Sequence, residues 1–171
     1  MAAGEKPSGK ASAKGERPAN QRGSARLAAV QALYQMELGG TTLPEVLAEF
    51  AAHRLGKEVD GEQYRDADAA FFRDLVSGVV RDQLQLDPAV HGALADDWPL
   101  ARIDATLRAI LRCGAYELAS RTDVPARVVI SEYVDVAKAF FDGEAAGMVN
   151  GVLDGLARTL RSDEFAVAGR P

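Results

Sequence analysis

The last third of the chain limits the fold most strongly, because three apolar patterns at helical spacing follow one another with short breaks. They cover residues 104–120, 125–140 and about 144–161. In each, apolar residues recur every three or four positions, which predicts a helix with one apolar face. The breaks, Thr122-Asp-Val-Pro125 and Asp142-Gly143, carry turn residues. Segments that follow one another with so few residues between them suggest one specific fold and not a generic bundle.

The same periodicity predicts four further helices upstream. The first covers residues 22–38 and stops at Gly39-Gly40, and the second opens at Thr42 with capping-box spacing and continues toward Leu55. A long helix is expected over 66–86, followed after the cap signal Asp87-Pro88 by a short one ending near Ala95. No segment of useful length alternates apolar and polar residues as a half-buried strand does. We therefore expect an all-α protein, a single compact bundle of about seven helices.

The faces predicted to be buried share i, i+3, i+4 spacing. Their residues are Leu27, Val30, Tyr34 and Leu38; Phe72, Leu75, Val76 and Val79; Leu107, Ile110, Leu111, Gly114 and Leu118; Val129, Tyr133, Val136, Ala137 and Phe140; Val149, Val152, Leu153, Leu156 and Leu160. Because Phe140 completes an inward stripe, Phe141 is expected to point outward, about 100° further around the helix.

The N-terminal segment has a different composition. Residues 1–20 are rich in Gly, Ser, Ala, Pro and Lys without apolar periodicity, which is typical of disorder. Residues 1–26 hold six basic and two acidic side chains, whereas the whole chain has a net charge of −5. A basic arm on an acidic body fits nucleic-acid contact, and it also fits a solubilising tail. We expect a disordered basic tail over 1–20, a helical domain over 21–162 and a C-terminal tail over 163–171.

Residues that would carry catalysis or metal binding are scarce. A single cysteine, Cys113, excludes an internal disulfide and favours a reducing compartment. His53 and His91 lack neighbours at metal-ligand spacing, and no glycine-rich loop has a phosphate-binding pattern. The chain also lacks an apolar run of membrane length and the apolar middle of a signal peptide. We therefore expect a cytoplasmic protein that is not an enzyme and needs no metal or cofactor.

Two arginines stand where the tail meets the first helix. Arg22 and Arg26 are four residues apart, so both would project from one helical face, and guanidinium groups pair with phosphate oxygens in a forked geometry. Lys14 and Arg17 could add looser phosphate contacts. This pattern suggests RNA binding, although solvated arginines at a helix start would look the same.

Five short motifs share their order and spacing with one known family. They are Ala29-Val-Gln-Ala-Leu-Tyr34, Phe71-Phe-Arg-Asp-Leu75, Tyr116-Glu-Leu118, Arg121-Thr-Asp-Val-Pro125 and Val149-Asn-Gly-Val-Leu-Asp154. As a set they resemble the bacterial NusB family of transcription antitermination factors over about residues 20–161. The chain departs from that pattern in its arginine run, which is reduced to Arg22 and Arg26, and at Met148, where some members have phenylalanine.

The resemblance implies a function. NusB-like proteins pair with the ribosomal protein NusE, and the pair binds the boxA segment of nascent rRNA transcripts; other Nus factors and RNA polymerase join indirectly. Self-association through the partner surface is also compatible with the family. Two alternatives stay open: an rRNA maturation or ribosome-assembly factor that uses the same RNA-binding surface, and a helical adaptor that binds only proteins.

The resemblance also suggests where the partner binds. The segment before and into the last helix corresponds to the shared protein and RNA surface of NusB complexes, and here it contains Phe141, Glu144 and Met148. An alternative is that Phe141 folds back and caps the core. Glu132 and Asn150 are expected to be polar anchors between the last two helices, because a polar group on a packed face needs a partner.

Overall fold

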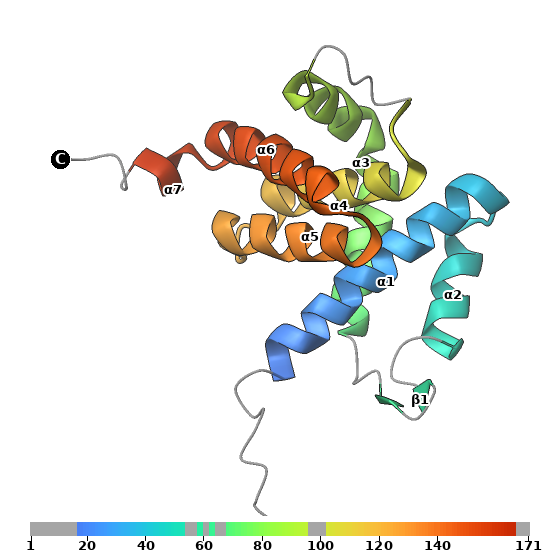
Figure 1. Ribbon diagram of the computed structural model, residues 1–171. Coiled ribbons are helices and arrows are strands. Elements are labelled where there is room, and N and C mark those ends of the chain that lie inside the picture. Colours follow the sequence, from blue (N-terminus) through green and yellow to red (C-terminus); the bar gives the residue numbers. More distant parts are fainter. Residues whose placement is uncertain (1–16, 54–57, 60–61, 64–67, 96–101, 167–171) are drawn as a thin grey trace, which may run out of the picture.

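The computed structural model describes residues 17–53, 58–59, 62–63, 68–95 and 102–166, and this part is helical as predicted (Figure 1). Its helices are α1 Arg17–Gly39, α2 Leu43–His53, α3 Ala69–Ala93, α4 Ala105–Ser120, α5 Ala126–Phe140, α6 Gly143–Leu160 and α7 Ser162–Ala166. Two-residue strands, β1 Glu58–Val59 and β2 Glu62–Gln63, form a small antiparallel hairpin between α2 and α3. The tail residues 1–16 and the predicted turn at 96–99 lie outside the described residues.

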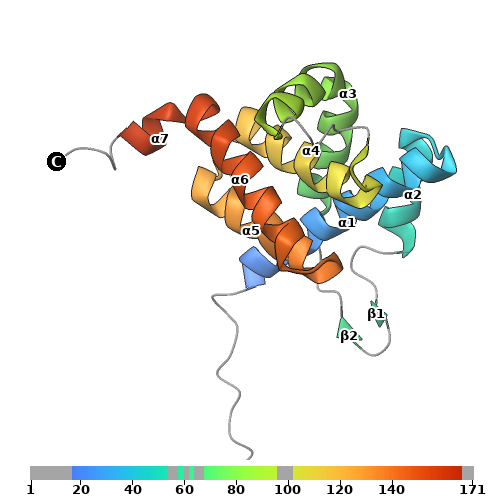
Figure 2. The same cartoon turned by 45° about the horizontal axis from the view of Figure 1, so that its top comes forward.

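Helix α4 is the centre of the bundle. It packs against α1, α3, α5 and α6, and its predicted apolar stripe is buried. Helices α5 and α6 run side by side, while α1 crosses beside α4 and carries α2 at its far end (Figures 1 and 2). Because α4 is surrounded, side chains on several of its faces are buried, including Cys113 and Glu117. The predicted α3 stripe is buried as well.

Two glycines let helices approach α4 closely. A Cβ atom on Gly78 of α3 would lie 2.6 Å from the hydroxyl oxygen of Tyr116, and closer still to its ring. A Cβ atom on Gly114 of α4 would lie 2.7 Å from a methyl carbon of Leu153 on α6. These two positions therefore need glycine because of neighbouring side chains, and not because of backbone conformation.

Local signals set the helix ends as expected. Gly40 has a φ of 67° and its N–H donates to the Met36 carbonyl over 3.1 Å, so it closes α1 in the left-handed conformation that glycine tolerates. Thr42 and Glu45 form the predicted capping box, with hydrogen bonds of 3.2 and 3.4 Å. Helix α1 begins at Arg17, five residues before its predicted start.

The separate short helix predicted after Asp87 does not exist. Helix α3 continues through Pro88 to Ala93, so the seventh helix is α7 instead. The Asp87 carboxylate accepts two hydrogen bonds from Arg112 of α4, at 2.8 and 2.9 Å, and therefore does not cap a helix. Val90 and Leu94 beyond the proline are buried. Burial and the ion pair thus offset the hydrogen bond that Pro88 cannot donate.

The apolar face of α1 differs from the predicted one in its second half. Val30 is buried, but Tyr34 and Leu38 are 39% and 60% exposed. The buried positions of α1 are mostly alanines: Ala25, Ala28, Ala29 and Ala32. The small alanine side chains let neighbouring helices pack closely on this face of α1. Tyr34 and Leu38 lie outside this contact.

The end of α6 is tied to the turn after α4 by one side chain. The Arg161 guanidinium is buried and donates to the carbonyl oxygens of Glu117, Leu118, Arg121 and Val124, over 2.7–3.1 Å. These carbonyls lie at the C-terminal end of α4 and in the turn after it, where a cation is favoured. The first residues of the predicted C-terminal tail belong to helix α7. Arg161 donates a hydrogen bond to Glu164 of this helix.

Candidate functional site

Arg22 lies on the surface where α1 meets the start of α3 and the α4–α5 turn. Its side chain is 37% exposed and sits over the Phe71 ring, 4.7 Å from the ring centroid. Its ion pairs are long, 3.9 Å to Asp68 and 3.7 Å to Asp123. Contacts of this length are weak, so the Arg22 guanidinium can exchange them for another anion.

Arg26 does not lie beside Arg22 as a second surface arginine. It is 2% exposed, and its Nε and Nη2 atoms donate to the two carboxylate oxygens of Glu117 over 2.8 and 2.9 Å. The Tyr133 hydroxyl donates to the same carboxylate, and Glu132 approaches Arg26 to 3.7 Å. Arg26 is therefore not the surface arginine that we predicted: its fork already binds a buried carboxylate, which an incoming phosphate cannot replace without exposing the core.

The ionisation of this buried group follows from its surroundings. Burial disfavours the charged guanidinium, but the hydrogen bond and the charge of Glu117 outweigh it, so the pKa of Arg26 lies above its ordinary value. Burial also disfavours the ionised form of Tyr133 and so raises the pKa of Tyr133, and the Glu117 charge adds to this effect. Arg26 and Tyr133 thus stay protonated, and both donate to Glu117.

Arg121 is a further arginine at this surface that we did not single out. It pairs with Asp74 at 3.2 Å and with Asp123 at 3.0 Å, and its guanidinium lies 5.0 Å from the Phe71 ring centroid. Three arginines, Arg22, Arg26 and Arg121, therefore surround one aromatic ring. Arg121 was visible in the turn motif, but only the folded chain brings it beside α1.

The other two predicted basic residues, Arg17 and Lys14, precede Arg22 in the chain. Arg17 is the first residue of α1, which continues the helix toward the basic tail. Lys14 lies outside the described residues.

The predicted partner residues do not lie as expected. Phe141 is half-buried and packs against the core, while Phe140 is 41% exposed. The expected 100° step does not apply because α5 ends at Phe140, and Phe141 is extended, with φ −135° and ψ 171°. Glu144 is exposed in the first turn of α6, and Met148 is partly buried against the core.

A different apolar surface is exposed between α1, α2 and α5. Tyr34, Leu38 and Phe140 are the large exposed side chains around a hollow of ≈ 630 Å³ that reaches Val30 and Phe50. We call this the α1–α5 apolar surface. Large apolar side chains gathered in one place on a surface are typical of protein interfaces.

Glu132 and Asn150 do not tie α5 to α6 as predicted. Glu132 faces Arg26 of α1, and its pKa is raised because it is partly buried, although the Arg26 charge acts against this. Asn150 is exposed and lines a groove between α5 and α6.

Other chemistry finds little support in the described residues. Cys113 is fully buried, and burial raises the pKa of its thiol, which keeps it protonated and unreactive. Nowhere in the part that the structure describes do three His, Cys, Asp or Glu side chains gather as metal ligands would. None of the helices in the described ranges has the length and apolar character of a membrane span.

Comparison with known proteins decides the family. The model of the NusB family matches residues 23–158, which covers the helices from α1 to nearly the end of α6. The chain belongs to the NusB family. The transcription antitermination protein NusB of Rhodopseudomonas palustris (strain BisB18) is 66% identical over 153 residues, which is 90% of each chain. The same-named protein of Bradyrhizobium diazoefficiens is 63% identical over 150 residues, 88% of this chain and 91% of that one.

Solved NusB structures share the fold. NusB of T. maritima superposes with a TM-score of 0.69 at 28% identity, covering 85% of this chain and 96% of that one. A crystal structure of the antitermination factors NusB and NusE in complex with dsRNA gives a TM-score of 0.67 at 27% identity, covering 81% and 97%. The helical arrangement around α4 is therefore the NusB arrangement.

Proposed function

We propose that this chain is an RNA-binding transcription antitermination factor that pairs with NusE and binds boxA RNA of nascent rRNA transcripts in the cytoplasm. The observation that carries the proposal is the match of nearly the whole helical domain to the NusB family, one structure of which contains NusE and RNA. The mechanism is assembly without catalysis. Joint binding of RNA and protein to one scaffold raises the affinity for both.

Arg22 is the described arginine best placed to contact RNA phosphates. It stands at the surface, it follows Lys14 and Arg17 in the sequence, and its two ion pairs are long, at 3.7 and 3.9 Å. A phosphate can take over from Asp68 or Asp123 without exposing the core.

Replacing Arg22 by alanine should weaken RNA binding similarly for all sequences and lower the salt slope of binding by about one ion equivalent. Thermal stability should hardly change, because exposed ion pairs contribute little. Filter binding over a series of salt concentrations measures the slope. The control is Arg102→Ala, since Arg102 is exposed and has no ion pair with any described residue. Equal salt slopes for both variants would contradict the role of Arg22.

The α1–α5 apolar surface is the proposed site for NusE. Phe140 takes the anchoring role that we had expected of Phe141, and the exposed Glu144 lies close along the chain. An exposed aromatic anchor fits a protein interface, and the chain's net charge of −5 favours the encounter with a basic ribosomal protein.

Phe140→Ala should lower NusE affinity about tenfold or more, because buried aromatic anchors dominate interface energies. Its melting temperature should stay near that of the wild type, since the Phe140 side chain is 41% exposed before binding. Calorimetric titration with NusE provides the measurement. Leu84→Ala is the control, because Leu84 is 89% exposed on α3. If NusE binds both variants equally well, the partner surface lies elsewhere.

Titration of labelled boxA RNA with and without NusE tests the proposal as a whole. We expect weak, salt-dependent binding by the protein alone and much tighter binding by the pair. Equal affinity for transcripts without boxA would favour a general rRNA maturation role. A lack of salt-dependent RNA binding, with or without NusE, would leave the protein-only adaptor.

A further inference from the structure

We propose that α5, α6 and α7 form a second RNA-binding groove, in which Phe165 stacks on a base of single-stranded RNA while Arg127 and Lys138 contact its phosphates. The inference rests on the proposed RNA-binding function and adds a second contact region to it. This region lies apart from the α1 start, and Phe165 lies beyond the segment that the family model matches.

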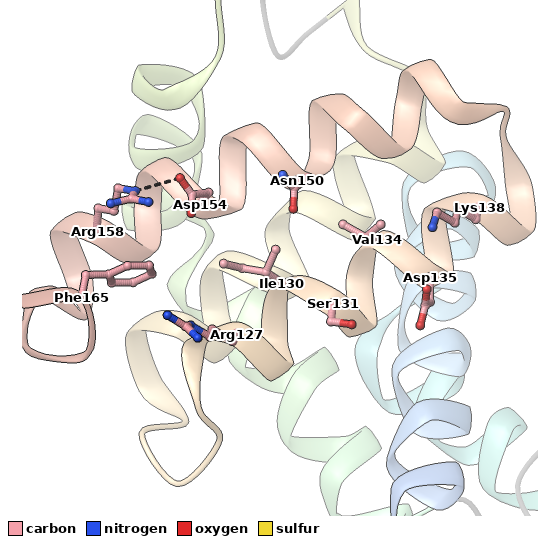
Figure 3. Close-up of a pocket in the computed structure, with 10 residues that line it drawn as sticks. All are labelled: Arg127, Ile130, Ser131, Val134, Asp135, Lys138, Asn150, Asp154, Arg158 and Phe165. Carbon is pink, nitrogen blue, oxygen red and sulfur yellow. Dashed lines mark hydrogen bonds and ion pairs between the residues drawn. The ribbon is translucent and has the colours of Figure 1, made fainter. Parts of the chain in front are cut away.

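The groove runs between α5 and α6 and has a volume of ≈ 600 Å³ (Figure 3). Its α5 side carries Arg127, Ser131, Asp135 and Lys138, and its α6 side carries Asn150, Asp154 and Arg158, so three cations face two carboxylates. Arg127 and Lys138 are eleven residues apart on one helix, so they are separated by about 16 Å along its axis. That length accommodates several nucleotides of an extended strand.

The groove's cations stand out on an otherwise acidic protein. Arg127 and Lys138 are exposed, and neither forms an ion pair with any residue that the structure describes. Arg158 holds Asp154 at 2.9 Å, an exposed contact that exchanges readily. Two unpaired cations at the two ends of a groove, on a chain of net charge −5, are placed to hold successive phosphates.

Phe165 supplies an aromatic platform at one end of the groove. The Arg158 guanidinium lies 4.8 Å from its ring centroid, and Figure 3 shows Arg127 of α5 pointing toward the ring. Helix α7 holds this ring in place, because Glu164 accepts hydrogen bonds from the Ala126 N–H over 2.9 Å and from Arg161 over 2.6 Å. A base that stacks here meets a platform that is already positioned, so it costs little ordering entropy.

The lining favours a nucleic acid over a protein segment. Its apolar members are Ile130, Val134 and Phe165, and the large hydrophobic side chains exposed elsewhere on the described surface are absent from it. Ser131 and Asn150 lie between the cations and offer a hydroxyl and an amide to base edges (Figure 3). A peptide groove would need a larger apolar floor.

Two labelled RNAs test the groove: a single-stranded boxA RNA, and the same RNA extended by a short unpaired run of uridines at either end. Phe165→Ala should weaken binding of the extended RNA about tenfold, because base stacking on aromatic rings contributes about 1–3 kcal/mol. Phe165→Tyr should retain it. The double variant Arg127→Ala, Lys138→Ala leaves α7 unchanged and should lower the salt slope by about two ion equivalents.

The control Arg102→Ala removes one positive charge outside the groove, where the double variant removes two inside it. If the groove variants bind the extended RNA as Arg102→Ala does, the groove has no RNA role, although the proposed function stands. If they bind RNA normally but lose NusE, the groove is a protein surface and the inference is wrong. If the wild type binds neither RNA, with or without NusE, the proposed function fails and the groove fails with it.

Discussion

Arg26→Ala should destabilise the protein by about 3–5 kcal/mol, because it leaves the Glu117 carboxylate buried without its cation. Glu117 is fully buried, and the only partners that the described structure gives its carboxylate are Arg26 and Tyr133. For a domain of this size the melting temperature should fall by roughly 10 °C or more. Thermal unfolding followed by circular dichroism measures the change.

Two further variants separate the buried ion pair from a general effect of losing an arginine. Arg22→Ala removes the neighbouring surface arginine and should melt close to the wild type. Arg26→Met combined with Glu117→Leu removes both charges and should recover much of the lost stability, because apolar residues of similar volume can replace a buried pair. If Arg26→Ala melts together with Arg22→Ala, the pair contributes little and our description of α1 packing is incorrect.

Gly78→Ala should cost roughly 3 kcal/mol, because the added methyl group would overlap the Tyr116 ring. Moving that ring also breaks the hydrogen bond of 2.7 Å that the Tyr116 hydroxyl donates to Asp74. Urea unfolding gives the free energy of unfolding directly.

Gly92→Ala is the matched control, since Gly92 lies in the same helix and a Cβ atom there meets nothing within 4 Å. Alanine is the better helix former, so this variant should be stabilised by about 0.5–1 kcal/mol. Tyr116→Leu in the Gly78→Ala background should restore part of the loss by making room. A Gly78→Ala protein as stable as Gly92→Ala would show that α3 and α4 are not in close contact at this point.

The sequence predicted the helices well where local signals agree. The bounds of α4, α5 and α6 differ from the predicted ones by a residue or so at each end. Their apolar stripes are long, and turn residues separate them, so spacing alone locates them. The same holds for the capping box at Thr42 and the glycine stop after α1.

What the sequence did not predict depends on contacts between distant segments. Arg26 looked like a surface arginine because nothing near it in the chain reveals Glu117, 91 residues away. Asp87-Pro88 looked like a helix start because the partner that binds the Asp87 carboxylate, Arg112, is 25 residues away in the chain. Phe141 was misplaced because the helical step of 100° was applied to it, although it is extended and lies beyond the end of α5 at Phe140. An error of one residue at a helix end is therefore enough to assign a side chain to the surface when it packs against the core.

The separation of Arg26 and Glu117 also bears on the order of events during synthesis. Helix α1 leaves the ribosome first, but the carboxylate that neutralises Arg26 follows 91 residues later, on α4. Until then, docking α1 against an apolar surface would bury an unpaired guanidinium, which costs several kcal/mol. The face of α1 that carries Arg26 therefore stays in water until α4 has emerged, although α1 can already pack against α2 and α3. One of the earliest segments to be synthesised is thus completed only when a much later helix docks.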